Sequence, residues 1–246
     1  NKYGGNKMIK KQALYEGKAK RIYATDDENI VWVEYKDSAT AFNGVKKAEI
    51  TGKGRLNNEI TSLLFFLLTA KGIANHFIKK VSDHEQLVKR VKIIPLEVIV
   101  RNYAAGSFSK RFGVDEGKRL KRPIVEFCLK NDELGDPPIT DDQIEVLEIA
   151  STDVIETLKT SALKINDILT EFFKECRLKL VDFKLEFGVD ADGNILLADE
   201  ISPDTCRLWD IDTNEKLDKD LFRQDLGNLI DAYETILQRL GGKQHV

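Results

Sequence analysis

The segment 180–202, LVDFKLEFGVDADGNILLADEIS, constrains the fold more than any other stretch of the chain. Its first half alternates strictly between charged and apolar residues, which places Asp182, Lys184 and Glu186 on one face of a strand. The intervening phenylalanine and leucine side chains share the opposite face. The segment therefore predicts a β-strand that presents a row of charged groups on one side and apolar groups on the other.

The dipeptide Asp192-Gly193 is a strong signal for a two-residue type I′ turn, which makes the segment an antiparallel hairpin. With that turn, Glu186 lies directly opposite Asp199. Opposed like charges destabilise a sheet unless a hard cation lies between them. We therefore predict a magnesium ion held by Glu186 and Asp199, with Lys184 near a phosphate or a substrate carboxylate. The alternative is a solvated outer face whose charges bind no ligand.

The loop that follows the hairpin, residues 202–210, begins with a Ser-Pro pair that ends strand pairing. A loop at this point can place Asp204 and Arg207 at the mouth of a cleft. The planar guanidinium of Arg207 suits a phosphate or a carboxylate. Taken alone, such an arginine more often forms a surface salt bridge.

A second candidate anion site is RNYAAGSFSKR, residues 101–111. Arg101 ends an apolar strand, the small residues allow close backbone approach, and Ser107 can donate its hydroxyl. This combination is typical of a phosphomonoester pocket. A small-residue turn with a solvated basic rim explains the same string equally well.

Two glycine–lysine motifs lie nearer the N-terminus. The string EGKAK, residues 16–20, falls between two candidate strands and could cover phosphates with backbone N–H groups and ammonium charge. It lacks the longer glycine-rich loop of a Walker A motif, and an ordinary hairpin turn is the alternative. The string GKG, residues 52–54, favours a flexible lead-in to a helix over an anion-binding helix N-terminus.

Hydrophobic periodicity divides the chain into a strand-rich first part and a mixed second part. We predict strands at 13–15, 21–24, 30–35, 76–81, 86–92 and 96–101, helices at 56–71, 152–176 and 220–240, and a loop-rich stretch at 118–142. These elements indicate an α+β fold. The predicted units are an N-terminal β-rich lobe, residues 1–93, and a C-terminal α/β domain, residues 94–246, which carries the substrate site.

Composition excludes several classes of protein. The net charge of −3 disfavours binding to nucleic acid or an anionic membrane. The cysteines are Cys128, Cys176 and Cys206, and their spacing suggests neither a zinc site nor a disulfide framework. The longest apolar run, residues 63–68, is too short to span a bilayer, and the first residues lack the apolar core of a signal peptide. We expect a cytoplasmic enzyme with no membrane or nucleic-acid partner.

Four strings together resemble the SAICAR synthetase (phosphoribosylaminoimidazole-succinocarboxamide synthase) family. They are YEGKAKRIY at 15–23, PLEVIVRNYAAGSFSKRFG at 95–113, LVDFKLEFG at 180–188 and LADEISPDTCRLWD at 197–210. The resemblance runs in order over about residues 13–241 and implies two lobes, the first similar to the small lobe of a kinase and the second similar to an ATP-grasp domain. It also implies an ATP- and Mg²⁺-dependent ligase that joins L-aspartate to carboxyaminoimidazole ribonucleotide (CAIR), through an acyl phosphate, in purine biosynthesis.

The resemblance also implies roles for individual residues. Lys18 and Lys20 are expected near the ATP phosphates, the adenine near the backbone of Ile93, and the magnesium on Glu186 and Asp199. The phosphate of the ribonucleotide is expected on Arg101, Ser107 and Arg207. Lys130, Asp182 and Lys184 are the catalytic candidates around the reacting carboxylate, and Asp37 and Asp204 line the substrate side.

Some alternatives stay open at this stage. The free aspartate has no assigned position, with Arg207 and Ser202 as nearby candidates. The oligomeric state is undetermined, and a homo-oligomer is compatible with the sequence. A small-molecule kinase and a non-catalytic nucleotide-binding module are the rival functions, and both predict a different dependence of phosphate release on the substrates.

Overall fold

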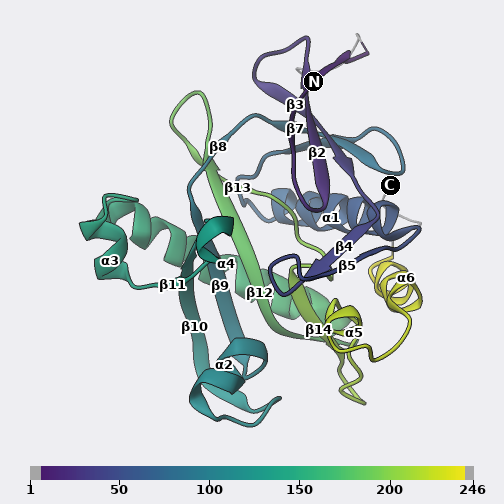
Figure 1. Ribbon diagram of the computed structural model, residues 1–246, viewed down its shortest axis with the longest axis vertical. Helices are drawn as coiled ribbons and strands as arrows, with labels where there is room; N and C mark the ends of the chain where they lie inside the picture. Colours follow the sequence, from purple (N-terminus) through teal and green to yellow (C-terminus); the bar gives the residue numbers. More distant parts are fainter. Residues whose placement is uncertain (1–6, 242–246) are drawn as a thin grey trace.

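The first part of the chain forms an antiparallel sheet of five strands (Figure 1), as seen in a computed structural model that describes residues 7–241. The strand order is β1-β2-β3-β7-β6. The bounds are Lys10–Glu16 for β1, Lys20–Thr25 for β2, Ile30–Tyr35 for β3, Phe77–Lys80 for β6 and Glu85–Lys89 for β7. A short ladder of β4 (Ser38–Ala41) and β5 (Lys46–Glu49) lies beside this sheet.

A second sheet of seven strands has the order β11-β10-β9-β12-β13, and β8 and β14 also pair with β12. The bounds are Lys92–Ile93 for β8, Leu96–Tyr103 for β9, Arg119–Leu129 for β10, Pro138–Ile139 for β11, Leu178–Val189 for β12, Ile195–Ala198 for β13 and Cys206–Asp210 for β14. The long strand β12 is the centre of this sheet, because it bonds to β9, β14, β13 and β8 along its length. It is the predicted strand of alternating charged and apolar residues.

The helices are α1 (Lys53–Ala70), α2 (Gly106–Phe112), α3 (Asp141–Val146), α4 (Thr152–Glu175), α5 (Asp220–Arg223) and α6 (Leu229–Arg239), with a 3₁₀ turn at Asp132–Leu134. The predicted helix 152–176 is confirmed as α4. Its start is fixed by Ser151, whose side chain accepts a hydrogen bond from the Val154 N–H group. Its apolar stripe packs on the second sheet, chiefly against β12.

One hydrophobic cluster joins α1 to the C-terminal elements. Phe65 of α1, Phe173 of α4 and Phe183 of β12 are all buried in it, together with Tyr233 of α6. The chain passes from the first sheet to the second between β7 and β8, whereas the predicted boundary between the lobes follows residue 93. Because α1 shares its core with the second part, that division into independent units stays a prediction.

The prediction that residues 118–142 are loop-rich is wrong for residues 119–129, which form the strand β10. The sequence PIVEFCL pairs with β9 in regular register from Ile124 to Leu129. Pro123 falls where the ladder shifts register between Arg119 and Ile124, so its missing N–H group costs no regular pairing. The proline misled the prediction because its position in a bulge cannot be recognised from sequence.

The prediction of a single last helix at 220–240 is also wrong. The chain forms a single turn, α5, and restarts as α6 after a break at 224–228. Asp225 has a left-handed backbone with φ 53° and ends the first helical turn. Asn228 then caps α6, its side chain accepting a hydrogen bond from the Asp231 N–H group.

Among the helices of residues 7–241, none combines the length and the apolar character that a bilayer crossing requires.

Candidate active site

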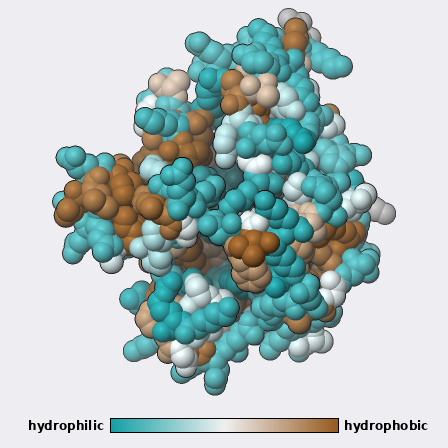
Figure 2. All heavy atoms as spheres, viewed as in Figure 1, coloured by the Kyte–Doolittle hydropathy of each residue, from teal (hydrophilic) through white to brown (hydrophobic). Residues whose placement is uncertain are grey.

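A cavity of about 600 Å³ lies between the two sheets and opens on the face shown in Figure 2, where hydrophilic residues surround a central hollow. Its walls come from β2, β3 and β7 on one side and from β12 and the 199–205 segment on the other. The predicted site residues that line it are Lys18, Lys20, Ile93, Lys130, Lys184, Glu186, Asp199 and Asp204. Residues far apart in the sequence are thus brought to one enclosed space.

The predicted register of the hairpin is wrong by one residue. Glu186 pairs with Ala198, and the loop contains three residues because the N–H group of Asp190 donates to the carbonyl of Asn194 at 3.0 Å. The Asp190 carboxylate also accepts the Asn194 N–H group at 2.9 Å, and Gly193 takes the left-handed conformation with φ 82°. A side-chain acceptor just before the turn therefore favours a three-residue loop over the two-residue type I′ turn.

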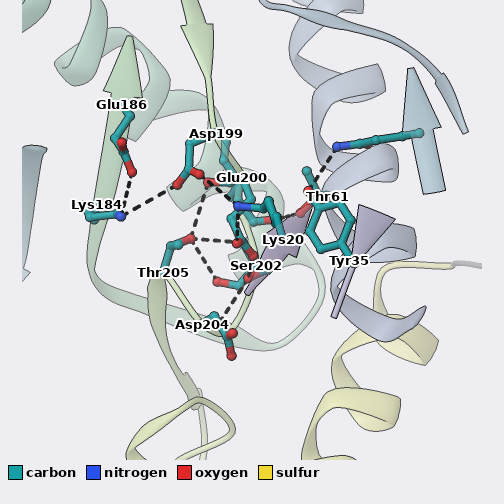
Figure 3. Close-up of polar contacts among 12 residues, drawn as sticks. Lys20, Tyr35, Thr61, Lys184, Glu186, Asp199, Glu200, Ser202, Asp204 and Thr205 are labelled. Atoms are coloured by element: carbon teal, nitrogen blue, oxygen red, sulfur yellow. Dashed lines mark hydrogen bonds and ion pairs between the residues drawn. The ribbon is translucent and has the colours of Figure 1, made fainter. Parts of the chain in front are cut away.

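The two predicted metal ligands nevertheless converge. Asp199 follows the end of β13 with a left-handed backbone, φ 53°, which turns its carboxylate towards β12. The ammonium group of Lys184 then lies between the carboxylates, 2.7 Å from Glu186 Oε2 and 3.6 Å from Asp199 Oδ2 (Figure 3). One cation thus contacts both acidic groups at the edge of the cavity.

Lys20 forms a second link across the cleft. Its ammonium group lies 2.8 Å from Asp199 Oδ1 and 2.6 Å from Glu200 Oε1, so β2 of the first sheet is tied to the end of β13. Lys130 contacts Glu186 from the segment after β10. Lys18 is exposed and reaches Asp132 at 3.5 Å. Lysines from both sheets therefore surround the Glu186–Asp199 pair.

The pKa values in this group follow from burial and charge. Burial alone lowers the pKa of Lys184, but the charges of Glu186 and Asp199 outweigh it and hold the pKa above its ordinary value. Burial raises the pKa of the Asp199 carboxyl, and Lys20 and Lys184 reverse that effect and hold it well below its usual range. Lys184 and Asp199 are therefore both charged at neutral pH.

The predicted phosphate ligands meet in a row across the second sheet. Asp182 of β12 is the direct neighbour of Arg101 on β9 and of Arg207 on β14. Its carboxylate accepts from Arg101 at 3.3 Å and from Arg207 at 3.2 Å. Arg101 also donates to the Ser107 hydroxyl at 3.0 Å, at the start of α2. This row holds one guanidinium group on either side of the Asp182 carboxylate, an arrangement that suits the binding of one phosphate.

A second cavity of about 720 Å³ adjoins the row and is lined by Arg101, Ser107 and Arg111. Gly106 allows the close approach of α2, because a Cβ atom at this position would lie 2.5 Å from the Arg207 guanidinium. Its φ of 52° also favours glycine. The predicted requirement for small residues in this string therefore has a specific cause.

Asp182 contacts the arginines and does not line the cavity between the sheets. Burial raises the pKa of its carboxyl despite the attraction of Arg207 and Arg101. A role in positioning the arginines fits these contacts better than the predicted catalytic role, which stays a prediction.

Asp37 is also placed away from the cavity. One of its carboxylate oxygens accepts the N–H group of Gly54 at 2.9 Å, in the first turn of α1. This hydrogen bond caps the first turn of α1, so Asp37 has a structural role that requires no substrate. The predicted contact between Asp37 and the substrate has no support in the geometry.

Lys53 is buried, although its string was expected to form a flexible lead-in. It begins α1, is 1% exposed, and its ammonium group lies 2.5 Å from Asp204 Oδ2. Tyr233 donates to the other oxygen of Asp204 at 2.6 Å. The glycines that flank Lys53 are the sequence feature that could have indicated this close packing. A Cβ atom at Gly54 would lie only 2.6 Å from the Tyr35 carbonyl oxygen.

The donor set suits a hard divalent cation. No group of three or more His, Cys, Asp or Glu side chains in residues 7–241 is arranged to hold a metal ion. Among the carboxylates that line the cavity, those of Glu186 and Asp199 lie nearest the Lys184 ammonium group, at 2.7 Å and 3.6 Å. Magnesium prefers one or two carboxylates together with phosphate oxygens and water, so this pair fits it only beside a bound nucleotide.

Comparison with known proteins decides the family. A family model described as SAICAR synthetase matches residues 13–240. The chain belongs to the SAICAR synthetase family. A phosphoribosylaminoimidazole-succinocarboxamide synthase of Bacillus subtilis is 63% identical over 239 residues, which cover 97% of this chain and 99% of that protein. The resemblance inferred from the four strings is thereby confirmed, and ATP-dependent ligation in purine biosynthesis is the activity of this family.

Solved structures of SAICAR synthetases share the fold. The enzyme of Ehrlichia chaffeensis has a TM-score of 0.92 at 50% identity and covers 94% of this chain and 99% of its own. A SAICAR synthetase in complex with ADP has a TM-score of 0.90 at 49% identity and covers 94% and 98%. The predicted α+β fold is confirmed as that of the SAICAR synthetases.

Proposed function

We propose that this protein joins L-aspartate to carboxyaminoimidazole ribonucleotide, with ATP and magnesium, to give SAICAR, ADP and phosphate. The observation that carries the proposal is that a single strand, β12, contributes residues to two anion-binding centres. β12 presents Lys184 and Glu186 to the cavity between the sheets and Asp182 to the arginine row. A nucleotide triphosphate and a sugar phosphate each have a cationic site, and the sites are fixed relative to each other.

ATP is proposed to occupy the cavity between the sheets. The apolar side chains of Ile22, Val33 and Val88 line one part of it and suit a purine ring. Ile93 lies beside them in β8, which pairs with Gly188 of β12. The triphosphate would then extend towards the charged groups, where lysines from both sheets neutralise it. Binding of ADP by a relative 49% identical to this chain supports the nucleotide.

Glu186 and Asp199 are the residues proposed to hold magnesium, and Lys184 marks the position between them. Bound there, magnesium would neutralise charge on the phosphates during transfer. The side chains do the remaining work. Lys184 and Lys130, both in contact with Glu186, can move onto phosphate oxygens once the carboxylates have another cation.

The ribonucleotide is proposed to bind with its phosphate on Arg101, Arg207 and Ser107. Asp182 orients both guanidinium groups, and its own charge is balanced by them. Further acidic partners, Glu126 on Arg101 and Asp220 on Arg207, fix other N–H groups at 2.9 Å and 2.8 Å. The donors are thus oriented before substrate arrives, which reduces the entropy lost on binding.

The chemistry follows in two displacements. An oxygen of the CAIR carboxylate attacks the γ-phosphorus of ATP, the bond to the β-phosphate oxygen breaks, and ADP leaves. The amine of aspartate then attacks the carbonyl carbon of the acyl phosphate and loses a proton, and phosphate leaves as the amide forms. Phosphoryl transfer depends mainly on positioning and charge neutralisation, which the lysines around Glu186 and Asp199 provide.

An assay of ADP release with each substrate omitted in turn tests the proposal. We expect steady ADP formation only when ATP, CAIR and L-aspartate are all present, together with a product of the mass of SAICAR. Full-rate ADP formation without aspartate would contradict the ligase and favour a small-molecule kinase. Tight ATP binding without turnover in any mixture would favour a non-catalytic nucleotide-binding module.

A further inference from the structure

Lys219 lines the cavity between the sheets, at an end where no contact with ATP or CAIR has been proposed. It precedes α5, and its backbone N–H group donates to the Pro203 carbonyl at 3.1 Å. Its side chain lines the cavity together with Asp204, Thr205 and Thr40. The backbone carbonyl of Lys219 accepts the N–H groups of Phe222 and Arg223, each at 3.0 Å, so the backbone of the residue is held on both sides.

The ammonium group of Lys219 differs from those of the lysines described above. Lys18, Lys20, Lys130 and Lys184 each pair with at least one carboxylate. No carboxylate within residues 7–241 forms an ion pair with Lys219, although the residue is half-buried. A half-buried ammonium group without a counter-ion is costly, and an anionic ligand would remove that cost.

Asp204, an acidic group of the same cavity wall, is already neutralised. Lys53 lies 2.5 Å from one of its oxygens and Tyr233 donates to the other at 2.6 Å. Burial lowers the pKa of Lys219, and the positive charges of Arg223 and Lys53 act in the same direction, whereas the carboxylates of Asp204 and Glu200 oppose them. Glu200 pairs with Lys20 at 2.6 Å, so both nearby carboxylates already have cationic partners and neither forms an ion pair with Lys219.

The substrate that fits this charge is the amino acid. The triphosphate and the sugar phosphate already have cationic partners in the proposed function, whereas the carboxylates of aspartate have none. Lys89 is another lysine of the cavity wall without an ion pair among the described residues, but it directly follows Val88, which lines the part proposed for the purine ring. Lys219 lies at the Asp204 end, where no phosphate ligand has been placed.

We propose that the ammonium group of Lys219 binds a carboxylate of the acidic amino-acid substrate. This inference rests on the proposed function, since it assigns a position to that substrate within the same cavity. It also makes Lys219 a determinant of specificity, because a neutral amino acid would leave the ammonium group without a counter-ion.

The test compares Lys219→Met with wild type, using L-aspartate and L-asparagine as the amine substrates. A charge-assisted hydrogen bond corresponds to roughly a 10- to 100-fold effect, so the KM for L-aspartate should rise by about that factor in Lys219→Met. The KM values for ATP and CAIR should stay within about twofold. The preference for aspartate over asparagine, measured as a ratio of kcat/KM, should fall by a similar factor. Lys219→Arg, which retains the charge, should recover part of the loss.

Lys216→Met is the matched control, because Lys216 lies on the same connection but pairs with Glu116 at 3.0 Å, outside the cavity. It should leave every KM unchanged. An unchanged KM for aspartate in Lys219→Met, or a rise for ATP or CAIR in its place, would overturn the inference. If wild type forms no ADP in response to aspartate, the proposed function itself fails. Should Lys219→Met fail to fold, Lys219→Gln and titration of aspartate by calorimetry decide the same point.

Discussion

Asp199 shows how one residue can correct the geometry of an active site. Its place next to Ala198 would point its side chain away from Glu186 if the strand continued regularly. The left-handed backbone at φ 53° ends the strand and redirects the carboxylate to Lys184 and Lys20. Aspartate accepts this conformation better than most residues do, and such outliers occur where a site fixes them.

At this scale we expect Glu186→Gln to reduce kcat by about 100- to 1,000-fold, because it removes one of the two carboxylates proposed to hold the magnesium ion that would neutralise the transferred phosphate. The buried side chain keeps nearly its shape, so the melting temperature should change little. Steady-state ADP release measures the effect. Glu171→Gln, on the exposed side of α4, serves as the control and should retain full activity. Equal activity in both variants would remove Glu186 from the proposed metal site.

The element that shapes the phosphate pocket is α2, together with the three strands that carry the arginine row. The helix begins at Gly106, against the Arg207 guanidinium, and ends next to Gly113, where an added Cβ atom would meet nothing within 4 Å. Both glycines have positive φ, 52° and 64°. Substitutions at the two ends of α2 can therefore distinguish the effect of backbone strain from the effect of contact with the pocket.

Gly106→Ala should raise the KM for CAIR by about 10-fold or more, because the new methyl group displaces the Arg207 guanidinium and weakens a charge-assisted hydrogen bond. Gly113→Ala imposes a similar backbone strain, about 1–2 kcal/mol, without touching the pocket. Its KM for CAIR should therefore match wild type. Steady-state kinetics with varied CAIR distinguish the variants, and identical KM values in both would contradict the role of Arg207 in phosphate binding.

At the scale of the whole molecule, a network of buried charges joins the arginine row to the last helices. Asp218 accepts the N–H groups of Leu208 and Asp220, each through its carboxylate, and Asp220 pairs with Arg207. Burial, followed by repulsion from Asp220, raises the pKa of Asp218 to about 7. Folding therefore holds a proton on Asp218 that the unfolded chain releases at lower pH.

The sign of the pH effect follows from this difference. Between the ordinary pKa of 3.8 and about 7, raising the pH favours the unfolded state, which has already lost the proton. From pH 5 to pH 8 this group should cost the wild type about 3 kcal/mol of unfolding free energy. Asp218→Asn lacks that loss, so its unfolding free energy relative to wild type should increase with pH. Urea titrations of both proteins at pH 5 and pH 8 measure this difference in unfolding free energy.

Asp192→Asn, in the exposed hairpin turn, controls for a general effect of removing a negative charge. Its unfolding free energy relative to wild type should be the same at pH 5 and pH 8. A constant difference between Asp218→Asn and wild type across that range would show that Asp218 is ionised in the folded protein throughout.

Sequence patterns predicted those features of the structure that depend only on residues close together in the chain. The alternation of β12 gave the shared face of Lys184 and Glu186, because side-chain direction in a strand depends only on sequence spacing. Asp199 was placed by a turn type that the Asp190 side chain changes, and its final direction depends on a backbone angle set by packing. The burial of Lys53 depends on Asp204, a partner distant in sequence, and no local pattern reveals it.

The central position of β12 has a consequence for the spacing of the two binding centres. Asp182 and Glu186 lie four residues apart on one extended strand, which fixes a separation of about 13 Å between the arginine row and the acidic pair. Because both residues lie on the same strand, neither a movement of the lobes nor a change in a loop alters this separation. A single inserted residue between them would turn Glu186 into the hydrophobic core, so this stretch should tolerate no change of length.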